Sequence, residues 1–175
     1  MNHSLFLWET VGTIVIFLLG SFIHFGYELT DKINIFTAIF AVNESVWEHS
    51  KLTFWAPLIY ALIEYFFIGN LYPNFFISKT LSAIITTIAM ISLFYSYCGI
   101  IGHHSLIIDL IIYEISIIVG LLISYKINTI PQLPYFFNKA SIFLIILSII
   151  IFYLFSYNPP KIPLFKCAVT GKYGV

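Results

Sequence analysis

Histidine and carboxylate residues gather in parts of a chain that is otherwise strongly apolar. His24 and Glu28 are four residues apart, so on a helix their side chains lie on one face, about one turn from each other. Residues 43–51, NESVWEHSK, add Glu48 and His49 in the densest polar segment of the sequence. Imidazole and carboxylate groups at such spacings can bind a divalent metal such as zinc, or can exchange a proton with a substrate.

Further groups of this kind follow in the second half of the chain. His103 and His104 are consecutive, and both could bind one ion only in an irregular turn, because neighbouring residues diverge on a helix. Asp109 follows inside an apolar stretch, where we expect it to be protonated and hydrogen-bonded or to point into a polar cavity, because a lipid-facing carboxylate is costly. The candidate metal ligands are His24, His49, His103 and His104, and the candidate catalytic residues are His24, Glu28, Glu48, His49 and Asp109.

The same residues also have a structural interpretation. Ser45 and Glu48 match the S-x-x-E capping box that begins a helix, and Glu44 would favour the same N-terminus. If the helix includes all of this run, Glu44, Glu48 and Lys51 share one face, and His49 lies about 100° away. Capping does not require His49 or a second glutamate, so the structural and the functional interpretations both stay open.

The elements that must position these groups are membrane helices. Of 175 residues, 60% are hydrophobic and 9% are charged, against roughly 25% charged residues in an average soluble protein. A soluble domain of this length could not bury so much apolar surface. The formal net charge is zero and the sequence has no arginine, so nucleic acid is not an expected partner. Composition thus excludes an ordinary cytosolic enzyme, a disordered tail and a nucleic-acid binder.

We predict an all-α protein, an integral membrane bundle of five transmembrane helices. About 20 apolar residues are needed to cross the hydrocarbon core, and five stretches qualify, at about residues 5–27, 52–69 with an extension back to 43, 79–103, 105–125 and 139–161. Residues 31–43 are too short to cross, so we expect a short interfacial or re-entrant segment there. Residues 1–158 then form a single transmembrane domain. Residues 159–175 form a proline-containing tail, which either folds back as a lid over the polar layer or is mobile.

The lysines predict an orientation, because five spans place the termini on opposite sides. One side carries Lys79, Lys126 and Lys139, and the other carries Lys32, Lys51, Lys161, Lys166 and Lys172. The positive-inside rule therefore predicts a protein of the cell membrane with its N-terminus outside and its C-terminus in the cytoplasm. Trp47 and Trp55 are expected in the aromatic belt at the interface.

Three blocks of the sequence resemble one protein family. They are residues 40–58, FAVNESVWEHSKLTFWAPL, residues 102–110, GHHSLIIDL, and residues 158–174, NPPKIPLFKCAVTGKYG. Together they resemble a family of small bacterial multi-pass membrane proteins of unknown function, over nearly the whole chain. This resemblance implies a membrane location and implies no particular activity.

A second resemblance is to the emopamil-binding and sigma-2-receptor-like membrane domain. Phe22-Ile23-His24 with Glu28 is similar to the F-I-H-x-x-x-E pattern of that superfamily. Glu48, followed by Trp55 and Pro57-Leu58, is similar to its glutamate, tryptophan and Pro-Leu spacing. The resemblance implies that His24, Glu28 and Glu48 shuttle a proton across a sterol double bond.

Three functional hypotheses follow. The first is an intramembrane enzyme that acts on a lipid or isoprenoid, by metal-dependent hydrolysis or by acid–base proton transfer. The second is a non-enzymatic binder of an ion or amphiphile, or a small transporter, in which Asp109, Glu114 and Glu64 would form part of a proton-linked path and a homo-oligomer would supply further helices. The third is an accessory subunit. Capping alone does not explain why the histidines concentrate on one side, so we favour an enzyme in the bilayer with a lipid-like substrate.

Overall fold

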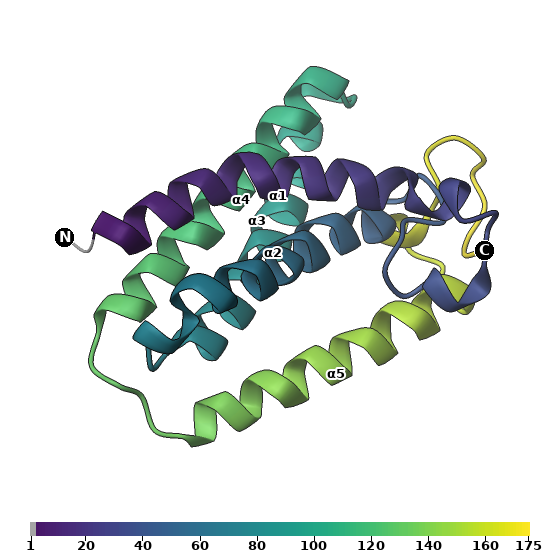
Figure 1. The fold of residues 1–175 in the computed structure, drawn as a ribbon. Coiled ribbons are helices and arrows are strands. Elements are labelled where there is room, and N and C mark those ends of the chain that lie inside the picture. The colour runs from purple at the N-terminus through teal and green to yellow at the C-terminus, as the bar shows by residue number, and fades with distance from the viewer. Residues whose placement is uncertain (1–2) are drawn as a thin grey trace.

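The computed structural model describes residues 3–175 and is built from helices (Figure 1). The long helices are α1 (His3–Leu29), α2 (Val46–Ile68), α3 (Phe75–Ile101), α4 (Leu106–Thr129) and α5 (Phe136–Tyr157), and the short 3₁₀ helices are η1 (Asn34–Phe36), η2 (Gly69–Leu71) and η3 (Pro163–Phe165). Each of the five long helices is apolar and long enough to cross a membrane. The prediction of a five-helix membrane bundle is therefore confirmed, with helix ends within about one turn of the expected positions.

Helix α2 lies at the centre of the bundle. Of its apolar window, 61% is buried, against 33% or less in each of the other four long helices. Helices α1 and α3 pack against α2 and both pack against α4, while α5 runs along one flank (Figure 1). The start of α1 and the C-terminus lie at opposite ends of the bundle (Figure 1). Large apolar side chains, such as Phe66 and Ile107, cover the outer surface, as expected of helices that face lipid.

Two glycines allow close helix approach, as small residues often do between membrane helices. A Cβ atom at Gly120 of α4 would lie 2.8 Å from the carbonyl oxygen of Ser82 in α3. At Gly20 of α1 it would lie 1.7 Å from the hydroxyl of Tyr113 in α4, which donates a hydrogen bond to the carbonyl of Ile16 at 3.2 Å. The contacts of α4 with α3 and α1 therefore depend on these two positions.

The segment between α1 and α2 does not form a long helix, in agreement with its short apolar length. The chain reverses at Asp31 and Lys32, which both have positive φ, and the Lys32 amide donates to the Tyr27 carbonyl at 3.0 Å. Helix η1 follows, and Thr37 behind it is fully buried. This segment therefore packs into the protein at the end of the bundle where α1 ends and α2 begins.

The tryptophan prediction is wrong for Trp55. Only 9% of this residue is exposed, and its indole N–H donates to the Ala38 carbonyl at 2.9 Å. Because the segment before α2 provides this acceptor inside the protein, the indole ring lies in the core and not at the membrane–water interface. Trp47 is half-buried and packs against Phe152 of α5 and Phe165 of the tail.

The C-terminal tail folds back onto the bundle, so the lid alternative is the one found. The Ala168 amide donates to the Glu44 carbonyl at 3.0 Å, and the Val175 amide donates to the Ser156 carbonyl at 2.9 Å. The side-chain amide of Asn43 donates to the Gly174 carbonyl at 3.0 Å. These contacts hold the tail against α5 and against the loop that precedes α2.

Candidate functional site

The start of α2 decides which way its polar side chains point. Ser45 is the N-cap, and its hydroxyl accepts a hydrogen bond from the Glu48 amide at 3.2 Å, so this half of the capping box is confirmed. The side chain of Asn43, and not that of Glu48, accepts from the Ser45 amide at 2.9 Å. Because the helix begins at Val46, Glu44 precedes it. The expectation that Glu44 shares a helical face with Glu48 and Lys51 is therefore wrong.

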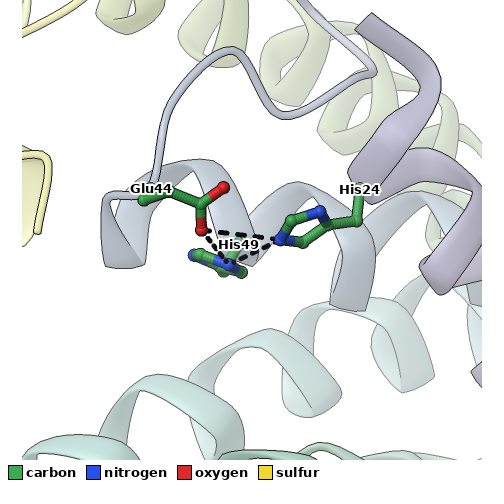
Figure 2. A group of neighbouring side chains, drawn as sticks. All are labelled: His24, Glu44 and His49. Carbon is green, nitrogen blue, oxygen red and sulfur yellow. Dashed lines mark hydrogen bonds and ion pairs between the residues drawn. The ribbon is translucent and has the colours of Figure 1, made fainter. Parts of the chain in front are cut away.

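Three side chains from separate segments meet at this end of the bundle (Figure 2). His24 comes from α1, Glu44 from the loop and His49 from α2. The Nε2 atoms of the two histidines are 3.1 Å apart, and Glu44 Oε2 lies 3.3 Å from Nε2 of His49 and 3.6 Å from Nε2 of His24. Ligand atoms around a tetrahedral zinc ion, with bonds near 2.0–2.2 Å, are about 3.3–3.5 Å apart. The three atoms thus already have nearly the spacing of one face of a zinc site.

Hydrogen bonding of His49 favours the ring form that a metal requires. Its Nδ1 atom lies 2.8 Å from the Ser45 carbonyl oxygen, which can only accept, so Nδ1 carries the proton in this bond. In the neutral ring Nε2 then has a free lone pair directed at the cluster. Nδ1 of His24 is buried and has no hydrogen-bond partner in residues 3–175. A backbone carbonyl therefore orients His49, whereas the Nδ1 side of the His24 ring is held by packing.

Glu44 lies outside the long helices, and its charge suits the same site. Without a metal, a hydrogen bond from Nε2–H of the doubly protonated His49 ring holds the pKa of Glu44 below its ordinary value, although partial burial opposes this effect. A zinc ion would take the place of that proton. The charges of His49 and His24 act in the same direction as the hydrogen bond. The carboxylate is therefore ionised at neutral pH, as a metal ligand must be.

The cluster forms part of the wall of a cavity of about 850 Å³. Most of its lining is apolar and comes from α1 to α4, including Phe25, Leu52, Met90, Phe94, Leu110 and Ile112. The tail closes another side with Lys166 and Cys167. A large apolar cavity with a few polar groups in its wall is typical of a small-molecule site.

Asp109 and His104 line the same cavity. Asp109 accepts a short hydrogen bond from the Tyr97 hydroxyl, and its other oxygen lies 3.3 Å from Nδ1 of His104. Tyr97 in turn accepts from the Ser105 amide at 3.1 Å, which joins α3 to the start of α4. The prediction that Asp109 is hydrogen-bonded is thus confirmed. His103 is exposed, and neither it nor His104 joins the cluster of His24, Glu44 and His49.

Glu48 does not reach the cavity. It is 1% exposed and forms a short ion pair with Lys51, which is itself 0% exposed. The Glu48 carboxylate also accepts from the Val42 amide and from the Ser156 hydroxyl, both at 3.0 Å. Lys51 donates to the Thr37 carbonyl at 2.6 Å as well. Lys51 therefore does not belong to the exposed lysines that the positive-inside rule counts, because it is enclosed by the loop before α2 and by α5.

Glu28 is also apart from the cluster. It pairs with Lys32 at 3.3 Å, and its side chain is 71% exposed. Of the three residues that the emopamil-binding resemblance implies, only His24 lies in the cluster, because Glu28 faces the surface and Glu48 is sealed. Glu44 was missing from the candidate residues. Its position just before the N-cap, five residues from His49, was the available signal.

Comparison with known proteins identifies the family. The model of a family of unknown function, DUF6512, matches residues 2–175. No curated protein matches the chain, and no solved structure does, so the emopamil-binding resemblance has no support. The first resemblance, to a membrane protein family without a known activity, is confirmed. The chain belongs to the family of unknown function DUF6512.

Proposed function

We propose that this protein is an intramembrane metalloenzyme that hydrolyses a lipid-like substrate, with zinc held by His24, Glu44 and His49. The observation that carries the proposal is the position of these three ligand atoms, 3.1–3.6 Å apart, in the wall of an apolar cavity of about 850 Å³. A structural zinc site is closed by four protein ligands, whereas a catalytic site has three and keeps one position for water or substrate.

Zinc in this position would supply a nucleophile. Bound zinc lowers the pKa of its water to about 7 and polarises a carbonyl or phosphoryl oxygen. The apolar lining from α1 to α4 would hold an acyl or isoprenoid chain, with the bond to be cleaved at the polar wall. Asp109, supported by Tyr97, borders the same cavity and is the available group for carrying a proton to or from the substrate.

A metal-free form of the hypothesis has its own supporting observation. His24 Nε2 and His49 Nε2 are at hydrogen-bond distance, and Glu44 lies 3.3 Å from the latter, so one proton can be exchanged between His49 Nε2 and either neighbour, as in an acid–base group. Such a group could perform acid–base isomerisation of a lipid without an ion. Metal content of the purified protein separates the two forms.

The positions of the exposed lysines also predict how the protein is oriented in the membrane. Lys51 and Lys79 are buried, so the exposed lysines are Lys126 and Lys139 at one end and Lys32, Lys161, Lys166 and Lys172 at the other. The second end is the one that carries the cluster of His24, Glu44 and His49. By the positive-inside rule this site then lies at the cytoplasmic boundary of the membrane, together with the C-terminus.

The experiment uses protein in lipid nanodiscs with cobalt(II) in place of zinc. The visible spectrum of cobalt reports its coordination, so alkyl hydroxamates of increasing chain length can be followed as they bind the open position. We expect affinity to rise about fourfold for each added CH₂ group that enters the cavity. Leu110→Trp, which narrows the cavity, should remove the chain-length dependence and leave the cobalt spectrum without hydroxamate unchanged. Binding that is independent of chain length in the wild type would contradict a lipid-like substrate.

A further inference from the structure

A second group of ionisable side chains is buried at the other end of the bundle. Lys79 of α3 lies between two carboxylates, with its Nζ atom 2.9 Å from Glu9 Oε1 of α1 and 2.6 Å from Glu64 Oε2 of α2. The Ser124 hydroxyl of α4 donates to the same oxygen of Glu9 at 2.7 Å. Along α1, fifteen residues or about 22 Å separate Glu9 from His24, so this group is distinct from the candidate zinc site.

The side chains of this group are almost completely enclosed. Glu64 is 0% exposed, and Glu9 and Lys79 are 5% and 4% exposed. Glu9 Oε2 and both oxygens of Glu64 are buried without a hydrogen-bond partner in residues 3–175, and Glu64 Oε2 is held only by its ion pair with Lys79. A buried ionised carboxylate needs donors for both oxygens, whereas a protonated carboxyl needs fewer.

The charges of this group do not balance. Two ionised carboxylates and one ammonium carry a net charge of −1, and no other charged side chain of residues 3–175 forms an ion pair with them. The other titratable group nearby is Tyr60, whose hydroxyl donates to the Trp8 carbonyl at 2.7 Å. From α4 the group is faced by the neutral Ser124. An uncompensated charge in a membrane-spanning bundle is expensive, and a bound proton removes it.

We infer that Glu9, Glu64 and Lys79 form a proton-binding site that holds one proton shared by the two carboxyl groups. The hydrogen-bond pattern places this proton mainly on Glu64. Glu9 accepts from both Lys79 and Ser124, which stabilises its ionised form, whereas Glu64 has the ion pair with the shared lysine and no hydroxyl donor within residues 3–175. Because the two groups interact strongly, the proton belongs to the pair, and removing either carboxyl changes the state of the other.

The inference predicts a proton count for each variant. The wild type holds one protonated carboxyl in the site. Glu64→Gln and Glu9→Gln each leave one carboxylate facing one lysine, so each should hold none. Lys79→Met leaves two carboxyl groups without a cation, so it should hold two. Infrared spectroscopy of protein in nanodiscs measures the C=O stretching band of protonated carboxyl groups, which shifts in D₂O. Glu114→Gln, in α4, is the control for a carboxyl group outside the site.

The expected result is a C=O band of protonated carboxyl groups that weakens in Glu64→Gln and in Glu9→Gln and strengthens in Lys79→Met. The part of the band that these three variants change should be unaffected by Glu114→Gln. A band of wild-type intensity in folded Glu64→Gln would overturn the inference. Failure of Glu64→Gln to fold would overturn it too, because the neutral amide has the shape of a protonated carboxyl and should be accommodated. A loss of intensity in Lys79→Met would show that the lysine does not compensate the carboxylates.

Discussion

Glu48 and His49 are neighbours near the start of α2, yet their side chains lie in opposite surroundings. Glu48 is 1% exposed, and its carboxylate has partners inside the protein for both oxygens. His49 borders the large cavity and contacts His24 and Glu44. Because successive helical residues diverge by about 100°, one helix supplies a sealed ion pair on one face and an open cluster on another.

The comparison shows why burial of an ionisable group does not by itself indicate function. The pair of Glu48 and Lys51 fastens the loop, α2 and α5 together, and it leaves no room for a ligand. The cluster of His24, Glu44 and His49 has the distances of a metal site and opens on free volume. We therefore expect changes in the sealed pair to alter stability, and changes in the open cluster to alter ligand binding.

The largest effect is expected from Lys51→Met. This change leaves Glu48 buried without its cation, so the free energy of unfolding should fall by about 3–5 kcal/mol. Thermal unfolding in nanodiscs measures the loss. The double variant Glu48→Gln/Lys51→Met removes both charges and should recover most of the stability. If Lys51→Met unfolds like the wild type, the pair is not sealed and the comparison fails.

Glu44→Gln is expected to act on metal binding and hardly on stability. Even a supporting residue of a metal site typically contributes about 10–100-fold in affinity, so losing this carboxylate ligand should weaken zinc binding by at least that factor. Glu28→Gln is the matched control, because Glu28 lies at the same end of the bundle but is exposed and paired with Lys32. Zinc titration followed by calorimetry compares the two variants. Equal zinc affinities of Glu44→Gln and Glu28→Gln would show that Glu44 is not a ligand of the metal.

The dependence of zinc affinity on pH should sharpen the assignment of ligands. His49 lowers the pKa of Glu44, so this carboxylate stays ionised even somewhat below its ordinary pKa. It loses its charge only as the pH falls through the lowered value. Acidification should therefore release zinc through protonation of the two imidazoles, while Glu44 is still charged. Affinity should fall over the same pH range in wild type and in Glu44→Gln. A wild-type profile that follows carboxylate titration would contradict this order.

The smallest effect is expected from Ala168→Pro in the tail. This change removes the amide that donates to the Glu44 carbonyl, a bond worth about 1 kcal/mol, and should loosen the tail over the cavity. Alkylation of the buried Cys167, in a Cys98→Ser background, reports the opening and should become faster. An unchanged rate would mean that the other contacts of the tail are sufficient to hold it closed.

The number and type of the long helices could be predicted from the sequence, because apolar stretches of about 20 residues indicate membrane helices directly. The Ser45 cap was also predictable, since its hydroxyl acts on an amide three residues away. The helices and the cap both follow from residues that are close together in the sequence, so they can be predicted without knowing how the helices pack.

The composition of the site was only partly predictable. His24 and His49 were named, but whether Glu44 or Glu48 joins them depends on the residue at which α2 begins, a difference of one turn. Lys51 and Lys79 were counted with the other lysines of their membrane sides, and their burial was not predicted. Burial of Lys79 depends on Glu9, which is distant in sequence, and burial of Lys51 depends on partners from the loop before α2 and from α5 as well as on the nearby Glu48.

The metal content of the purified protein tests the central claim most directly. Wild-type protein reconstituted in nanodiscs should retain one zinc ion per chain after gel filtration against zinc-free buffer, measured by mass spectrometry of the metal. His24→Ala/His49→Ala should retain none while its five helices remain folded by circular dichroism. Wild-type protein that cannot be loaded with zinc or any other divalent ion, or a double variant that still retains the metal, would contradict the account.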